Sequence, residues 1–142
     1  MASGARHKKI GYQLKRLQSL LRARMDAALD ERGLTTPQYA ALSAIEAAPG
    51  LSNAALARRS FVTPQTMIRI LDKLLARGLI VRASHPEHGR VLQTTLTARG
   101  ARLVARCHAG VDAVERQLVA PLDAAERGAL LDALERCASA LE

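Results

Sequence analysis

The chain has 142 residues, enough for one domain with its own core; hydrophobic residues fill 49% of its positions and aromatic residues only 2%. Without Trp, the core must be built from Leu, Ala, Val and Ile, as in helix-rich proteins. No apolar run could span a bilayer, no secretory signal follows the basic N-terminus, and two cysteines cannot form a disulfide framework, so we expect a reduced, cytoplasmic protein.

A long amphipathic helix is predicted from Ile10 to about Arg32. Gly33 is expected to end it. Its apolar residues recur at helical spacing: Leu14, Leu17, Leu21 and Met25. A long helix with a narrow apolar stripe is typical of one that packs against something outside its own globule. A second helix is predicted from Gln38 to Ala48, and we expect it to pack behind the next two helices.

Two further helices are joined by a short turn. Ser52 is the expected N-cap of a helix from Asn53 to Arg59. After Ser60-Phe61-Val62, another helix is predicted from its N-cap Thr63, with Pro64 in the first turn, to Arg77 before Gly78. A connection this short is the requirement of a helix-turn-helix.

The second helix of this pair has an apolar back and a polar front. The inward residues follow the i, i+3, i+4, i+7 pattern: Met67, Ile70, Leu71 and Leu74. The outward and flanking residues include Gln65, Thr66, Arg69, Asp72 and Lys73. Gln and Arg are side chains that read base edges in the major groove of DNA. A merely solvated face is the alternative for an isolated helix.

A β-hairpin is predicted after Gly78. The runs Leu79–Val81 and Val91–Leu96 are rich in β-forming residues, and Pro86 and Gly89 mark a turn between them. A helix-turn-helix followed by a hairpin is a winged helix. The neighbouring helix and this hairpin favour DNA reading over a merely solvated helix face.

Two more helices are predicted at the C-terminal end. Thr97 is the expected cap of one that reaches about Val119, and Asp123 that of another from Ala124 to Leu141. The helices at both ends carry more apolar surface than a small winged helix can cover, so two chains are expected to cover each other. A two-fold dimer would place two recognition helices ~34 Å apart, one turn of DNA.

The positive charge is unevenly distributed along the chain. Residues 1–34 and 35–100 each carry +5, whereas residues 101–142 carry −2. A one-sided basic charge is typical of a nucleic-acid binder. A membrane surface would also accept it, but the sequence shows no basic amphipathic helix with large apolar anchors.

These residues resemble the MarR family of bacterial transcription regulators. The resemblance covers nearly the whole chain and is carried by L-A-R-R, T-P-Q-T-M, L-D-K-L, G-L-I-V-R and L-T-A-R-G. It implies a mainly α fold: a winged helix-turn-helix over 35–100 with a two-stranded wing, and dimerisation helices over 10–32 and 101–142. It also implies a homodimer that binds pseudopalindromic operator DNA, usually as a repressor. Many members respond to small phenolic or lipophilic compounds, and others to oxidants or metals.

Carried onto this chain, the resemblance indicates a set of DNA contacts. Arg90 is the expected wing-tip arginine, in the minor groove, and His88 stands where family wings commonly have an acid. The remaining expected contacts are Ser52, Asn53, Arg58, Arg59, Thr63, Pro64, Gln65, Thr66, Arg69 and Lys73. Expected walls of an effector pocket are Leu14, Leu17, Tyr39, Leu42 and the early part of the helix after Thr97.

The remaining His, Cys and aromatic residues do not indicate a metal site, a redox site or an active site. His85 and His88 lack the further ligands of a metal site, so neither metal nor cofactor is expected. Cys107 and Cys137 lie on apolar helix faces and are interpreted as buried, inert thiols. Tyr39 and Phe61 are interpreted as packing residues. The sequence has no phosphate loop or catalytic set, so we expect no enzyme.

The sequence thus predicts a homodimeric, sequence-specific regulator of double-stranded DNA. A non-specific architectural DNA binder and a winged-helix protein-interaction module remain as alternatives. The operator, the regulated genes, the effector and the sign of regulation do not follow from the sequence.

Overall fold

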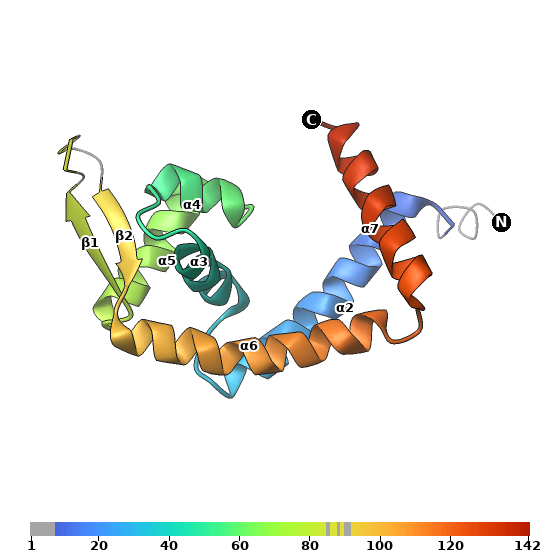
Figure 1. The fold of residues 1–142 in the computed structure, drawn as a ribbon, viewed down its shortest axis with the longest axis horizontal. Coiled ribbons are helices and arrows are strands. Elements are labelled where there is room, and N and C mark those ends of the chain that lie inside the picture. The colour runs from blue at the N-terminus through green and yellow to red at the C-terminus, as the bar shows by residue number, and fades with distance from the viewer. Residues whose placement is uncertain (1–7, 85, 88, 90–91) are drawn as a thin grey trace.

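A computed structural model describes residues 8–84, 86–87, 89 and 92–142 of the chain. The described part is mainly helical with one two-stranded antiparallel sheet, which confirms the predicted fold class (Figure 1). The elements in chain order are α2 (Ile10–Asp30), α3 (Thr36–Ala47), α4 (Asn53–Arg59), α5 (Pro64–Ala76), β1 (Ile80–Ser84), β2 (Leu92–Leu96), α6 (Ala98–Val119) and α7 (Ala124–Ser139).

The helix α6 connects two parts of the molecule. The helices α3, α4 and α5 and the β-hairpin form a lobe at its N-terminal end, whereas α7 and the N-terminal part of α2 lie at its C-terminal end (Figure 1). The core sits in the lobe, where apolar side chains from every lobe element and the start of α6 are buried. Its fully enclosed members include Leu42, Ile45, Leu56, Met67, Leu71, Leu74, Ile80 and Val104.

The helix starts are set by side-chain caps. The side-chain oxygens of Thr35, Ser52, Thr63, Thr97 and Asp123 each accept a hydrogen bond from the backbone amide three residues later, at 2.8–3.3 Å. These bonds satisfy amides that lack helical partners, and they confirm the predicted starts at Ser52, Thr63, Thr97 and Asp123. The helix predicted from Gln38 begins at Thr36, because Gln38 bonds back to Thr35 in a capping box.

The wing is attached to α6 by a close backbone contact. The strands β1 and β2 pair from Ile80 with Leu96 to Ser84 with Leu92. The carbonyl oxygen of Leu79 accepts a hydrogen bond from the Thr97 amide at 3.1 Å. A Cβ atom placed on Gly100 would lie only 2.0 Å from this same oxygen. Glycine therefore lets the first turn of α6 lie directly against the start of the wing.

Much apolar surface on α2 and α7 is uncovered within one chain. The helix α7 has no buried residue. The exposed apolar side chains on the two helices include Ile10, Leu14, Leu17, Leu20, Leu130, Leu131 and Leu134. This confirms the prediction that the ends of the chain carry more apolar surface than the winged helix covers. Among the described residues, no helix has the length and apolarity of a membrane span.

Two sequence-based interpretations are wrong for the single chain. Cys107 is buried as predicted, but Cys137 is exposed because it lies on α7, a helix with no buried residue. Tyr39 is buried as a packing residue, but Phe61 is 96% exposed. Phe61 lies in the turn between α4 and α5, where the backbone directs its side chain outward rather than into the core.

Candidate nucleic-acid interface

The helix α5 has one polar, exposed face and an opposite apolar face that is buried in the core. Met67, Leu71 and Leu74 are fully buried, and Ile70 is nearly so. Gln65, Arg69 and Lys73 are exposed on the opposite side. Because the apolar stripe prevents rotation of the helix, the donors of this face are held in one direction. The structure therefore places the predicted reading side chains where a DNA groove could receive them.

The first turn of α5 is ordered by its own hydroxyl groups. Thr63 accepts from the Thr66 amide at 3.2 Å and donates its hydroxyl proton to the Thr66 oxygen at 3.0 Å. The Thr66 hydroxyl therefore keeps its own proton for another acceptor. Thr63, Pro64, Gln65 and Thr66 are all exposed, so the turn is accessible to DNA.

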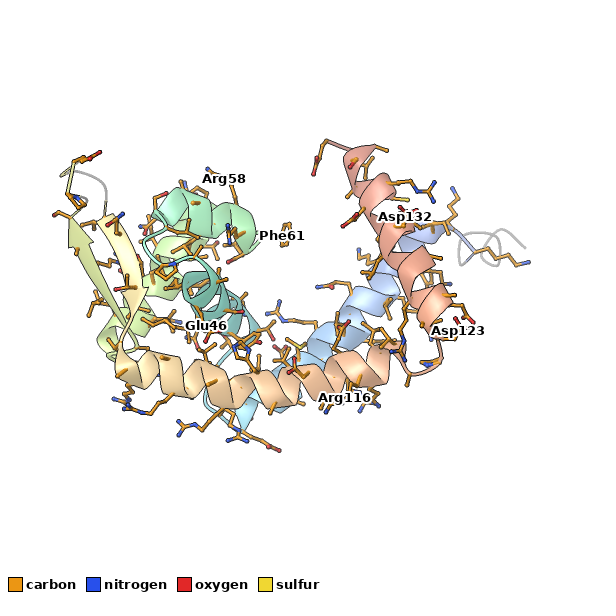
Figure 2. The ribbon with its side chains drawn as sticks, viewed as in Figure 1. Glu46, Arg58, Phe61, Arg116, Asp123 and Asp132 are labelled. Carbon is orange, nitrogen blue, oxygen red and sulfur yellow. The ribbon has the colours of Figure 1, made fainter. Side chains whose placement is uncertain are left out.

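The DNA contacts predicted at α4 fall into two groups, one at each end of the helix. Arg58 and Arg59 are exposed in the last turn of α4, and Figure 2 shows Arg58 on the outer side of that helix. Ser52 and Asn53 are half-buried at the other end. The Ser52 oxygen already caps the helix at 3.3 Å from the Ala55 amide. Arg58 and Arg59 are therefore the more accessible phosphate candidates.

An ion pair between α5 and β1 connects the reading helix to the wing. Arg82 lies 3.8 Å from the carboxylate of Asp72, and the Arg82 side chain is only 14% exposed. Helical spacing predicts that Asp72 lies on the outward face of α5 but does not predict its contact with Arg82. Only the β1–β2 pairing directs Arg82 toward α5, so periodicity on the helix could not reveal this contact. The wing-tip candidates His88 and Arg90 lie outside the described residues.

A basic hollow of about 310 Å³ borders α5 and reaches α2 and the start of α3. Arg22, Arg69 and Lys73 contribute cations to it, and none of the described residues that line it is acidic. Such a hollow attracts an anion such as a backbone phosphate. Arg22 was not predicted as a site residue, because on α2 it is only one of several exposed basic residues.

A more apolar cavity of about 400 Å³ lies between α2, α3, α6 and the α4–α5 turn. Its apolar lining is formed by Leu21, Met25, Pro37, Ala40, Phe61, Val62 and Val111. Arg22, Gln18 and Glu115 supply its polar groups. The cavity thus combines an apolar wall with one cation, Arg22, and one anion, Glu115, so a small aromatic acid would fit with its carboxylate at Arg22 and away from Glu115.

The four predicted pocket walls are not brought together. Leu42 is completely buried in the core, and Leu14 is 43% exposed on α2. Leu17 lines a small separate hollow of about 100 Å³ between α2 and α6. Tyr39 lines an open hollow of about 650 Å³ along α3. Met25, Ala40 and Phe61 border both this hollow and the 400 Å³ cavity, so the two adjoin.

Polar contacts join α2 to α3 at the edge of the cavity. The Arg22 Nε donates to the Asp26 carboxylate at 3.2 Å, and the Thr36 hydroxyl donates to the same carboxylate. The hydrogen bond from Thr36, together with the nearby Arg22 guanidinium, lowers the pKa of Asp26. The carboxylate therefore stays ionised and holds Arg22 at the cavity mouth.

A second polar network joins α3 to α6. The Tyr39 hydroxyl lies 2.7 Å from His108 Nδ1, and His108 Nε2 lies 2.8 Å from the Glu46 carboxylate. Burial, and secondly the charge of Asp112, raise the pKa of Tyr39. The Tyr39 phenol therefore stays neutral to a higher pH than an ordinary tyrosine. The lobe is thus tied to the long helix α6 by directional bonds as well as by apolar packing.

Comparison with known proteins identifies clear relatives. A family model described as MarR family matches residues 32–91. The transcriptional repressor Rv2887 of Mycobacterium tuberculosis is 40% identical over 130 residues, covering 92% of this chain and 94% of the relative. Its structure with salicylic acid has a TM-score of 0.73 at 40% identity and covers 91% of this chain and 96% of that one. Its structure with DNA has a TM-score of 0.73 at 37% identity, covering 91% and 97%.

Proposed function

This chain belongs to the MarR family of winged-helix transcriptional regulators, and we propose that it is a homodimeric repressor that small aromatic acids release from its operator. The observation that carries the proposal is the direction of α5. Gln65 and Arg69 face solvent from a helix whose opposite side is locked into the core. A regulator of this kind acts on chromosomal DNA, so the proposal places it in the cytoplasm.

Sequence discrimination is assigned to α5, and sequence-independent affinity to the surrounding cations. Gln65, Thr66 and Arg69 have the donors and acceptors that distinguish base edges. Arg58, Arg59 and Lys73 are assigned to phosphates, as is the start of α4 at Ser52 and Asn53. Arg90 and His88 are assigned to the minor groove and its flanking phosphates on the family resemblance.

The dimer is assigned to residues 10–32 and 101–142, with 35–100 as the DNA-binding part. Exposed leucines on α2 and α7 support this division. Each fully buried leucine contributes about 1.5–3 kcal/mol, so the several leucines here are enough to stabilise a two-fold dimer. Symmetry then places a second α5 in a neighbouring major groove, which explains a pseudopalindromic operator.

The effector is assigned to the 400 Å³ cavity between the two parts of the chain. The apolar lining would accept a ring, and Arg22 would bind the carboxylate of the ligand, as its Nε already donates to the carboxylate of Asp26. The salicylic acid complex of the relative Rv2887 supports this class of ligand. A ligand there would bias the angle between lobe and dimer, and hence the spacing of the two α5 helices.

The test is selection of bound sequences from random double-stranded DNA by the purified dimer, followed by titration of salicylate against the selected site. We expect a pseudopalindrome with half-sites about 10 base pairs apart, centre to centre, and release of the DNA by salicylate. Enrichment of no sequence would instead indicate an architectural DNA binder. No retained DNA at all would indicate a protein-interaction module.

A further inference from the structure

Phe61 has a backbone conformation that strongly favours glycine. Its φ is +54°, and it is the one non-glycine residue with positive φ in the described part of the chain. The Val62 amide donates to the Ala57 carbonyl at 3.1 Å, and the Phe61 amide donates to the Arg58 carbonyl at 3.3 Å. These two bonds form the turn that usually ends a helix with glycine. A residue with a Cβ atom is strained in this backbone conformation.

The side chain gains no packing in return for this strain. Phe61 is 96% exposed, and Figure 2 shows it projecting from the lobe towards the side where α2 and α7 lie. It is also the single Phe of the chain. A strained turn that holds a large apolar ring in water destabilises the isolated chain. The arrangement becomes favourable once something covers the ring.

The ring stands between the two adjoining hollows. Phe61 borders the 400 Å³ cavity and the 650 Å³ hollow, and Met25, Thr36 and Ala40 form the wall common to both. A flat aromatic molecule against this wall would have the Phe61 ring within reach of its other face. Its carboxylate could meet Arg22, which lines the cavity but not the 650 Å³ hollow.

We propose that Phe61 is an aromatic lid that closes over the ring of an aromatic acid bound in the 400 Å³ cavity. The inference rests on the proposed effector site and adds the residue that selects for aromatic ligands. Stacking covers the exposed ring and the ligand together, which removes apolar surface from water on both. Because Phe61 is two residues before Thr63, the cap of α5, lid closure acts directly on the entry to the reading helix.

The unique Phe allows a direct test on the full-length dimer. Incorporation of 4-fluorophenylalanine labels position 61 alone, so a single ¹⁹F resonance reports on the lid. We expect salicylate to shift this resonance in a saturable way, because the ligand ring current acts on the stacked fluorine. Cyclohexanecarboxylate has the same carboxylate but no aromatic ring, and a clearly smaller shift is expected. A resonance that stays in place while salicylate saturates the protein overturns the lid.

Substitutions give an independent measurement. Phe61→Ala should weaken salicylate binding about tenfold through loss of the stacked ring. Phe61→Trp should retain it and, as the single Trp of the chain, give a fluorescence signal. Leu75→Ala is the matched control, since Leu75 is an exposed apolar residue on α5 at 43% and borders neither hollow. Operator affinity without salicylate should stay within about twofold in all three variants.

A further variant separates the ring from the backbone strain. Phe61→Gly relieves the positive φ, so it should raise the melting temperature while binding salicylate as weakly as Phe61→Ala. If Phe61→Ala binds salicylate as tightly as the unmodified chain, the lid is overturned and the effector site stands. If the unmodified chain binds no salicylate, the proposed effector and the lid are both overturned.

Discussion

Replacing Gly100 with alanine tests how the wing is held against the rest of the chain. In a helix, Gly→Ala is ordinarily stabilising by about 1 kcal/mol. Here the new Cβ would lie 2.0 Å from the Leu79 carbonyl oxygen and 2.9 Å from its carbonyl carbon. Both atoms belong to the backbone, so no side-chain rotation can relieve the contact. The first turn of α6 must move away from the start of β1.

The expected magnitude follows from the contacts that this movement disturbs. Overpacking in a close-packed region costs about 1–3 kcal/mol. The hydrogen bond from the Thr97 amide to Leu79, worth about 1 kcal/mol, is weakened as well. These losses exceed the propensity gain, so we expect Gly100→Ala to lower the free energy of unfolding by about 1–3 kcal/mol.

The control is another glycine of the same helix. A Cβ on Gly110 would lie 3.6 Å from Ala28, an ordinary contact, so Gly110→Ala should instead stabilise the chain by up to about 1 kcal/mol. The assay is urea unfolding followed by circular dichroism, at one protomer concentration, because dimer stability depends on concentration. Equal effects of the two substitutions, in either direction, would refute the reasoning from the Leu79 contact.

Three further predictions concern the DNA interface and the α3–α6 contact. Arg69→Ala should remove operator preference while the dimer stays intact; an unchanged footprint and affinity would show that the reading face is wrongly assigned. Arg90→Ala should weaken binding and lower the slope of log K against log salt concentration by about one unit per protomer, and an unaltered slope would remove the wing from the mechanism. Because burial raises the pKa of Tyr39 above its ordinary value of 10.0, its contribution to stability is present below pH 10 and is lost as pH rises through the folded pKa. Tyr39→Phe should therefore flatten the decline of unfolding free energy above pH 10, as measured by urea unfolding across that range.

Local rules were sufficient for the elements of this fold. Thr63, Pro64 and Gly78 bound α5 because caps and backbone preferences act over three or four residues. The buried stripe of α5 follows from helical spacing alone, and with it the outward direction of Gln65 and Arg69. The hairpin likewise follows from two β-rich runs around a Pro and Gly turn, although its first strand runs over Ile80–Ser84 rather than the predicted Leu79–Val81.

The 400 Å³ cavity could not be found in this way. Its walls come from α2, α3, α6 and the α4–α5 turn, and neighbours such as Arg22 and Glu115 are far apart in the chain. Helical spacing shows that Leu42 and Tyr39 are apolar-face residues, but not which neighbour they meet. Leu42 enters the core and Tyr39 meets His108 on α6, which only the packing of the helices decides.

The sequence by itself therefore determined the winged helix, the capping residues that start its helices and the polar face of α5, since these depend on residues within a few positions of one another. The tertiary structure alone decided that Asp72 meets Arg82, that Gly100 lies against Leu79, and that Phe61 stands uncovered beside a cavity. Each of these depends on how whole elements pack, and the energies that select one packing are summed over many distant contacts.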